Sequence, residues 1–309
     1  MKKLISKLIV CTLIISLFAQ PVTVFAWNQT GHQVIAAIAW DNLTETAKMN
    51  IMKIMQEAPD DSDLLSFFDP DNPNAEKSYF MGASYWPDVV RDRDVRARWE
   101  KYHKGPWHYV GTYWKETENG PVDTDGFVDK EHVIERIEHF RQTLIDPDVS
   151  DSDKAVQVAW ILHLIGDIHM PLHNTSRVTD ETPDGDRGGN SFSLGDGWPW
   201  NLHAFWDGII DVVSPKTDEE DAHDYYLRHA QKIMSKYPKS EFGALISLQD
   251  AVIWNKEGKE ITKNKVYPNT LKQGEKPSEV YTETSHEIAM KRMALSGYRM
   301  AEFLNQIFG

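Results

Sequence analysis

The chain has 309 residues, of which 41% are hydrophobic and 26% charged, with a formal net charge of −14 and a mean hydropathy of −0.50. This composition is typical of a protein with a packed core and excludes long disordered stretches. The acidic charge excludes a protein that binds nucleic acid through a broadly basic surface. Any phosphate group would have to be bound by a few local arginines or by metal ions.

The first 26 residues have the features of a secretory signal peptide. Lys2, Lys3 and Lys7 precede an apolar run of about a dozen residues, which is too short to span a bilayer. Val24 and Ala26 stand where small residues precede a cleavage site. An uncleaved anchor is the alternative, and the short apolar run argues against it.

Cleavage after Ala26 would make Trp27 the N-terminal residue and would remove Cys11, the only cysteine. The mature chain, residues 27–309, would have no disulfide, and loss of three lysines would take its formal charge from −14 to −17. We expect this protein to be secreted, to an extracellular or periplasmic location, with no membrane anchor after cleavage. Metal ions could replace disulfides as stabilising links.

The rest of the chain shows helical periodicity and little of the alternation that is typical of strands. Thr44 is expected to cap the second of two helices, and Pro171 to end another. We predict an all-α fold, a single mainly helical domain with no linker or internal repeat. The segments with helical spacing are about 31–57, 127–146, 153–170, 202–213, 218–236 and 284–308.

Residues 174–201 form an irregular segment rich in Gly, Asp, Pro and Trp. The segment is too irregular for a helix or strand, and long loops in compact domains are often functional. We therefore expect this loop to contribute to a site.

Two His/Asp pairs have the four-residue spacing that places both side chains on one face of a helix. They are His163 with Asp167 and His203 with Asp207, and His173 lies between them in sequence. One such pair alone is more often a surface hydrogen bond or ion pair. Here both pairs lie in apolar sequence, where a carboxylate needs a counter-charge. Imidazole and carboxylate together are ligands that zinc accepts, so the pattern predicts a metal site.

Further candidate ligands are Trp27, His32, Asp88 and His108. A free terminal amine and its carbonyl at Trp27 can chelate a metal, with His32 as a third ligand. Asp88 follows a proline and could instead cap a helix. His108 stands between aromatic residues and could instead be a hydrogen-bonded core histidine.

Taken in order, these segments form a recognisable series: Trp27 followed by GHQVIAAIA, then WPDVVR, WHYV, HLIGDIHMPLH, DRGGN and NLHAFWD. The series resembles the secreted trinuclear-zinc nucleases, the family of single-strand-specific nucleases and 3′-nucleotidases, whose sister group is the bacterial zinc-dependent phospholipase C. The resemblance covers essentially the whole of residues 27–309.

The resemblance implies three Zn²⁺ ions and assigns their ligands. Asp167 would bridge two of the ions. One zinc would take Asp88, His108, His163 and Asp167, a second His173, His203 and Asp207, and a third Trp27, His32 and Asp167.

The resemblance also implies hydrolysis of a phosphodiester by a metal-activated water, leaving 5′-phosphate products. Its catalytic residues would be Asp167, Arg91 and Asn190, of which Arg91 and Asn190 would also bind the phosphate. Tyr109 would stack on an unpaired base. The alternatives are a surface ion pair for Arg91, a plain turn for Asn190 and a core position for Tyr109.

The sequence departs from the family at Gly111, where members commonly carry Asp or Asn to hydrogen-bond the base. The alternative function is therefore a zinc-dependent phospholipase C, and a third is an exported protein with structural zinc only. The spacing of Trp27 and His32, and Asp207 as the last carboxylate, favour the nuclease. We expect a monomer with no stable protein partner, acting on single-stranded RNA, DNA or nucleotides.

Overall fold

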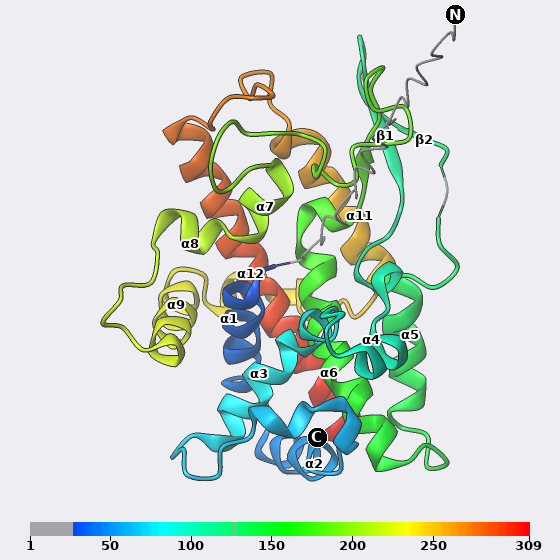
Figure 1. The fold of residues 1–309 in the computed structure, drawn as a ribbon, viewed down its shortest axis with the longest axis vertical. Coiled ribbons are helices and arrows are strands. Elements are labelled where there is room, and N and C mark those ends of the chain that lie inside the picture. The colour runs from blue at the N-terminus through cyan, green and yellow to red at the C-terminus, as the bar shows by residue number, and fades with distance from the viewer. Residues whose placement is uncertain (1–26, 127) are drawn as a thin grey trace, which may run out of the picture.

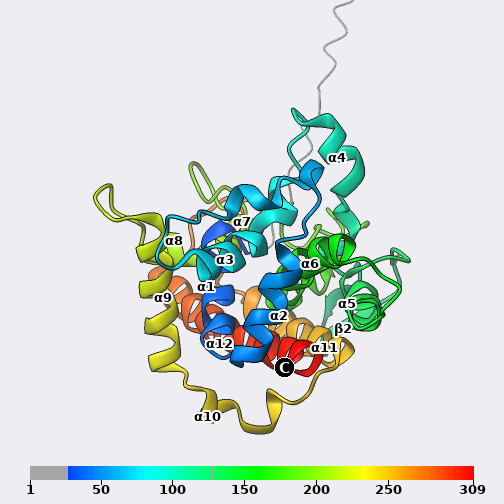
Figure 2. The ribbon, with the colours of Figure 1, turned by 90° about the horizontal axis from the view of Figure 1, so that it is seen from below.

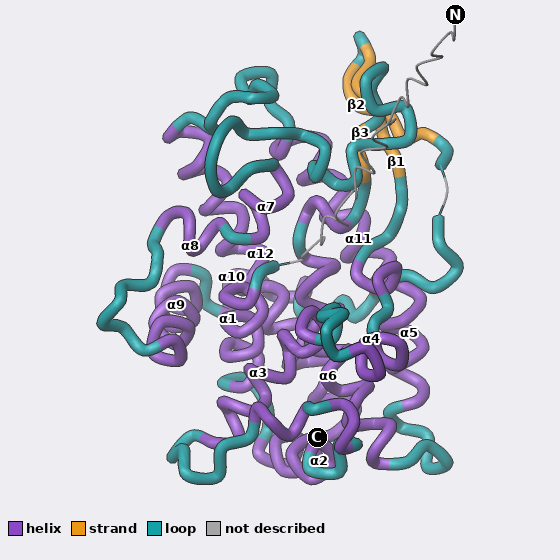
Figure 3. Tube along the Cα trace, viewed as in Figure 1, coloured by secondary structure: helices purple, strands orange, loops and turns teal. Residues whose placement is uncertain are grey.

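A computed structural model describes residues 27–126 and 128–309, and the predicted signal peptide, residues 1–26, lies outside them. The described part contains twelve α-helices and one small sheet (Figure 1). The expectation of a mainly helical fold is confirmed, since the three strands are short and gather at one corner (Figure 3). None of the described helices combines the length and apolar character that crossing a membrane requires.

Helix α6 (Asp151–His169) lies at the centre of the fold and is buried along most of its length. The Ser150 hydroxyl caps it by accepting a hydrogen bond from the Asp153 amide at 3.1 Å. The helix ends just before Pro171, which has no amide hydrogen to continue it. From Val158 to Ile168 its sequence is apolar or glycine except for His163 and Asp167, which fits a helix segment that is covered on all sides. The covering helices are α2 (Glu45–Met55), α3 (Ala75–Val89), α5 (Val133–Thr143), α11 (Ala251–Ile261) and α12 (Glu279–Phe308).

Helix α1 (Gln29–Trp40) carries the N-terminal segment into the core, where it packs against α3, α9 (Ala222–Lys236) and α12. Figure 2 shows α1, α2 and α12 lying together. The approach of α12 is close, because a Cβ at Gly297 would lie 2.6 Å from Ile38 Cγ2. Thr44 caps α2 by accepting from the Ala47 amide at 3.1 Å, so this predicted boundary is confirmed.

Several boundaries differ from the prediction. Helices α3 and α11 were not expected, and Pro87 lies inside α3 and does not precede it. The segment expected at 202–213 is two helices, α7 (Leu202–Asp207) and α8 (Ile209–Val213), which meet at Gly208. The other short elements are α4 (Arg96–Tyr102), α10 (Lys239–Phe242), η1 (Asp60–Ser62), η2 (Leu64–Phe67), η3 (Gly105–His108), η4 (Pro171–His173), η5 (Gly243–Leu245) and η6 (Thr262–Val266).

The sheet fixes the irregular loop 174–201 beside the segment that follows His108. Strands β1 (Tyr113–Thr117) and β2 (Gly120–Thr124) form an antiparallel hairpin. Strand β3 (Ser176–Arg177), at the start of the loop, pairs in parallel with β1 (Figure 3). Two segments predicted separately to contribute to a site therefore lie side by side.

Candidate metal centre

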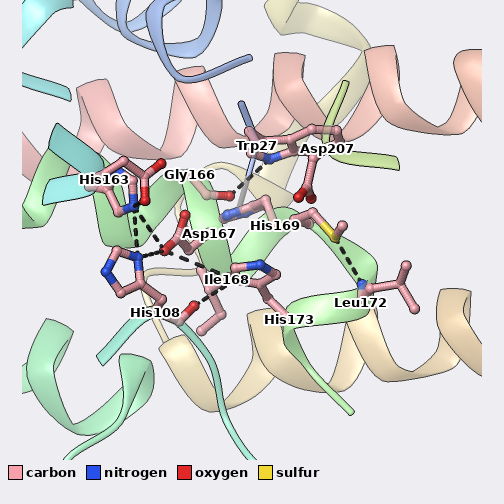
Figure 4. A network of polar contacts seen from close by, with 12 residues as sticks. Trp27, His108, His163, Gly166, Asp167, Ile168, His169, Leu172, His173 and Asp207 are labelled. Atoms are coloured by element: carbon pink, nitrogen blue, oxygen red, sulfur yellow. Dashed lines mark hydrogen bonds and ion pairs between the residues drawn. The ribbon is translucent and has the colours of Figure 1, made fainter. Parts of the chain in front are cut away.

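Helix α6 presents His163 and Asp167 on one face, as their spacing predicts. Asp167 is fully buried and lies beside His108 and His163 (Figure 4), and its two carboxylate oxygens face different histidines. Oδ1 lies 3.3 Å from Nε2 of His32, whereas Oδ2 lies 3.1 Å from Nδ1 of His108 and 3.2 Å from Nε2 of His163. The carboxylate thus stands between two groups of nitrogen donors, the arrangement that a bridging ligand needs.

Backbone carbonyls orient three of the imidazole rings. The Nδ1 atoms of His163, His173 and His203 lie 2.8, 2.6 and 2.7 Å from the carbonyl oxygens of Ser84, His108 and Gly188. A carbonyl oxygen only accepts, so each Nδ1 carries the proton and Nε2 is left as the donor of a lone pair. Such second contacts are typical of histidines that bind metals.

The clearest indication of a metal site comes from His173 and His203. Their Nε2 atoms lie only 3.3 Å apart, and the rings are stacked with centroids 5.1 Å apart. Because both Nδ1 atoms already face carbonyls, neutral rings have no proton to place between the two Nε2 atoms. Nε2 of His203 also lies 3.4 Å from an oxygen of Asp207. Two converging lone pairs and a carboxylate are suited to a cation.

The described residues contain three buried groups whose ligand atoms lie within 4.8 Å of one another. One group is the whole predicted set of the second zinc, and another is part of the set predicted for the first. The first group contains His32 with Asp88 and His163, so His32 lies near a neighbouring set as well as near Asp167. The groups are His32, Asp88 and His163; His108, His163 and Asp167; and His173, His203 and Asp207.

Metal ions fit this centre because the buried acids lack enough protein partners. Oxygens of Asp88, Asp167 and Asp207 are buried without a hydrogen bond from any described residue. One guanidinium, that of Arg91, lies 2.8 Å from Asp88. Buried carboxylates require a counter-charge, which bound cations would supply.

The titration properties follow from this burial. Burial raises the pKa of Asp167 to about 7, against the opposing effect of His163. Burial, and then the charges of Asp88 and Asp167, raise the pKa of Asp207 well above its ordinary value. Burial also lowers the pKa of His32 and that of His108. Metal ions would therefore displace protons from the carboxyl groups, and would meet His32 and His108 in their neutral form.

The predicted N-terminal residue lies against this centre. The Trp27 side chain is buried, and its indole Nε1 donates to the carbonyl of Gly166 at 3.1 Å (Figure 4). The next amide, that of Asn28, donates to the carbonyl of Asp207 at 3.1 Å. Contacts with α6 and α7 thus hold the start of the described chain between the two His/Asp pairs.

Asp88 and Arg91 lie at the end of α3. Asp88 is inside the helix, so the alternative of an N-terminal cap is wrong. The alternative for Arg91 was a surface ion pair. Arg91 does form an ion pair with Asp88, but the Arg91 side chain is only 11% exposed, so the pair does not lie on the surface. The guanidinium therefore lies next to a candidate metal ligand.

Tyr109 and Asn190 lie on the side of the loop 174–201. Tyr109 lines a cavity of about 190 Å³ together with Gly111, His173 and His203. Asn190 is not among the residues lining it, and its side-chain amide donates to the carbonyl of Arg187 at 2.8 Å. The structure thus brings Tyr109 to the metal candidates and gives Asn190 a role in the shape of the loop.

Two aspartates missed by the sequence analysis support the site. Asp186 is buried and accepts hydrogen bonds from the Arg177 amide at 2.9 Å and from the Tyr267 hydroxyl. Asp211 accepts from the side chains of Asn28 and Thr30. Asp186 is one of several acids in the Gly-rich loop, so the sequence gives only a weak signal for it. No local pattern indicates Asp211, since Asn28 and Thr30 lie more than 180 residues away in sequence.

Comparisons with known proteins agree with this arrangement. The family model described as S1/P1 Nuclease matches residues 27–309. Endonuclease 2 of Arabidopsis thaliana is 24% identical over 314 residues, covering 95% of this chain and 94% of that protein. Nuclease P1 of Penicillium citrinum is 26% identical over 296 residues, covering 92% of this chain and 98% of that protein. Nuclease S1 of Aspergillus oryzae is 25% identical over 186 residues, covering 59% of this chain and 54% of that protein.

Proposed function

Because the chain belongs to the S1/P1 nuclease family and is thus a hydrolase of phosphodiester bonds, we propose that it is a secreted, zinc-dependent enzyme with three metal ions. It cleaves single-stranded RNA and DNA to 5′-phosphate products and removes the 3′-phosphate of nucleotides. The observation that carries the proposal is the set of three buried His/Asp groups, two of which share His163.

The zinc ligands in this proposal are those assigned from the sequence. The mixed nitrogen and oxygen donors are the set that zinc accepts. Bound zinc would supply positive charge and Lewis acidity to a phosphodiester in an otherwise acidic protein. The ligands are Trp27, His32, Asp88, His108, His163, Asp167, His173, His203 and Asp207.

The chain's own residues then bind and orient the substrate. Arg91 donates to the non-bridging phosphate oxygens, and its contact with Asp88 holds its guanidinium in place. Tyr109 stacks on a base in the adjoining cavity, which requires that the base be unpaired. Asn190 fixes the loop through the Arg187 carbonyl. Its sequence-based role as a donor to the phosphate stays a prediction.

Secretion follows in this proposal from the predicted signal peptide. The family match begins at Trp27, the residue that cleavage after Ala26 would expose. Processing would free the α-amine of Trp27 beside the metal centre. The product is a monomer of residues 27–309 without a stable protein partner.

The test uses protein processed to Trp27 and loaded with zinc. It is incubated with a single-stranded oligonucleotide, with the same sequence as a duplex, and with phosphatidylcholine, and a chelated sample is the control. We expect zinc-dependent cleavage of the single strand to fragments whose 5′-phosphates are detected by mass spectrometry. Release of phosphocholine without cleavage of the oligonucleotide would overturn the proposal in favour of a phospholipase C.

A further inference from the structure

The cavity beside the metal candidates has two walls of different character. One wall is aromatic and comes from the segment entering β1, with Tyr109 and Tyr113. Gly111 lies between them and has no side chain to hydrogen-bond a ligand. Asp184 and Arg187 also line the cavity, from the loop 174–201. Polar recognition by side chains must therefore come largely from the loop.

Most other polar side chains of the cavity are already engaged. The Thr175 hydroxyl donates to the carbonyl of Thr112 at 3.1 Å, and the Ser176 hydroxyl accepts from the Gly188 amide at 3.0 Å. In contrast, the side chains of Asp184 and Arg187 form no hydrogen bond or ion pair with any residue of 27–126 or 128–309. Both residues are exposed, so their carboxylate and guanidinium are open to solvent and to a ligand in the cavity.

The backbone of this loop indicates that the arginine is held for its side chain. Arg187 has φ of 57°, in the left-handed region that disfavours every residue except glycine. A glycine would adopt this conformation without strain, as Gly188 and Gly189 do.

The loop is also fixed in place. The buried Asp186 carboxylate accepts hydrogen bonds from the Arg177 amide and the Tyr267 hydroxyl. A Cβ at Gly188 would lie 2.4 Å from the carbonyl oxygen of Leu172, next to His173. The residues on either side of Gly188 are therefore held close to the metal candidates before a ligand binds.

Building on the proposed function, we infer that Asp184 and Arg187 make this cavity selective for guanine. Guanine carries two adjacent donors, N1–H and the 2-amino group, which match the two oxygens of a carboxylate. It also carries two adjacent acceptors, O6 and N7, which match the fork of a guanidinium. Adenine, cytosine and uracil each lack at least one of these adjacent pairs. Proteins commonly read single-stranded bases through such edges while aromatic rings stack on their faces.

The activity test compares the four 3′-nucleotides as substrates of the processed, zinc-loaded enzyme. We expect kcat/KM for 3′-GMP to exceed that for the other three by about tenfold or more, the discrimination of a good bidentate contact. Asp184→Asn replaces one acceptor by a donor and should lower kcat/KM for 3′-GMP more than for the other three nucleotides, which removes most of this preference. Asp180→Asn, an exposed acid of the same loop outside the cavity, is the matched control.

Arg187→Lys separates base recognition from phosphate binding, because lysine keeps the charge but loses the fork. Guanine recognition predicts that this variant loses the preference for 3′-GMP. If instead Arg187 binds phosphate, Arg187→Lys keeps the relative order of the four substrates, and the inference is overturned. Zinc content and circular dichroism of each variant identify any that has lost its metal or its fold.

A binding measurement separates this inference from the proposed function. Guanosine and adenosine carry no phosphate, so calorimetric titration of the zinc-loaded enzyme reports the base cavity alone. We expect guanosine to bind about tenfold more tightly, and Asp184→Asn to abolish the difference. Equal binding of both nucleosides, or hydrolysis without base preference, overturns guanine selection and leaves the nuclease proposal standing. Failure to hydrolyse any nucleic acid substrate would overturn the nuclease proposal itself.

Discussion

The side-chain amide of Asn28 donates a hydrogen bond to the carboxylate of Asp211, 183 residues further along the chain. The same carboxylate accepts from the Thr30 hydroxyl at 3.0 Å and from the Tyr225 hydroxyl at 2.7 Å. These contacts fix the residues that immediately follow Trp27. Asp211 is thus placed to hold the proposed terminal ligand without touching the metal.

The first prediction concerns this anchor. Asp211→Ala removes the acceptor for three donors, so the segment carrying Trp27 should become mobile and the metal it binds should be held more weakly. Loss of a group that orients a ligand typically lowers metal affinity by about 10- to 100-fold. Competition with a chromogenic chelator measures the affinity for the most weakly bound zinc ion, and so detects this loss. The variant Asp224→Asn, an exposed acid on the neighbouring α9, serves as the control.

Should Asp211→Ala release zinc at the same chelator concentration as the unmodified protein, the anchor would have no role in the centre. Tyr225→Phe is a milder change, since it removes one donor to Asp211 and leaves the contacts of Asn28 and Thr30. It should weaken zinc binding less than Asp211→Ala does.

A second prediction tests the terminal amine directly. A protein that keeps one extra residue before Trp27 has an amide nitrogen there, which cannot act as an amine ligand. It should bind about one zinc fewer per chain and lose most of its activity. Native mass spectrometry counts the ions, and proteolytic removal of the extra residue should restore the third. Equal zinc content before and after removal would contradict the role of Trp27.

Arg91 provides the third prediction. Arg91→Ala removes donors to the phosphate and should lower kcat/KM by about 10²- to 10³-fold, the usual loss for one oxyanion donor. Because Arg91 also contacts Asp88 at 2.8 Å, rates must be compared between samples of equal zinc content. Arg91→Lys keeps the charge and should recover part of the loss. A rate within about threefold of the parent for Arg91→Ala would place the phosphate elsewhere.

The fourth prediction follows from the pKa of Asp167, which burial raises to about 7 from an ordinary value of 3.8. Between these values the folded metal-free protein binds more protons than the unfolded chain, so its stability falls as pH rises. The pKa of His163 is also raised, because Asp167 and Asp88 outweigh the effect of burial, and it acts in the same direction. Ionisation of Asp167 should cost the metal-free protein about 1 kcal/mol between about pH 6.5 and about pH 8.5.

Urea unfolding of the chelated and the zinc-loaded protein at these two pH values checks the sign. This range lies above the ordinary pKa of histidine, so His32 and His108, whose pKa values are lowered, contribute little to the change. The stabilisation by zinc should be larger at the higher pH. A smaller stabilisation there would show that these carboxyl groups do not face the metal.

Local patterns in the sequence were sufficient for much of the fold. Helix α6 and the boundary at Thr44 follow from periodicity, caps and a proline, all of which act within a few residues. Helix α3 was missed because Pro87 and several aromatic residues obscure its periodicity. The β1–β2 hairpin was missed for another reason: Lys259 of α11 and Lys263 of η6 form ion pairs with Asp123 of β2, and such partners cannot be read from the hairpin itself.

In the site, too, local patterns could be read from the sequence and distant partners could not. The His/Asp pairs on α6 and α7 are visible from their spacing, because a helix places such residues together. The carbonyls of Ser84 and Gly188 that orient His163 and His203 are not visible, since a backbone acceptor carries no mark in sequence. The partners of Asp211 depend on tertiary packing in the same way.

The central claim is that the three His/Asp groups form one trinuclear zinc centre completed by the terminal residue. Anomalous diffraction at the zinc edge from crystals of protein processed to Trp27 tests it most directly. The account predicts three zinc peaks, with Asp167 bridging two of them and the amine and carbonyl of Trp27 binding one. Fewer zinc peaks in a fully zinc-loaded crystal, or a third zinc bound without Trp27, would contradict it.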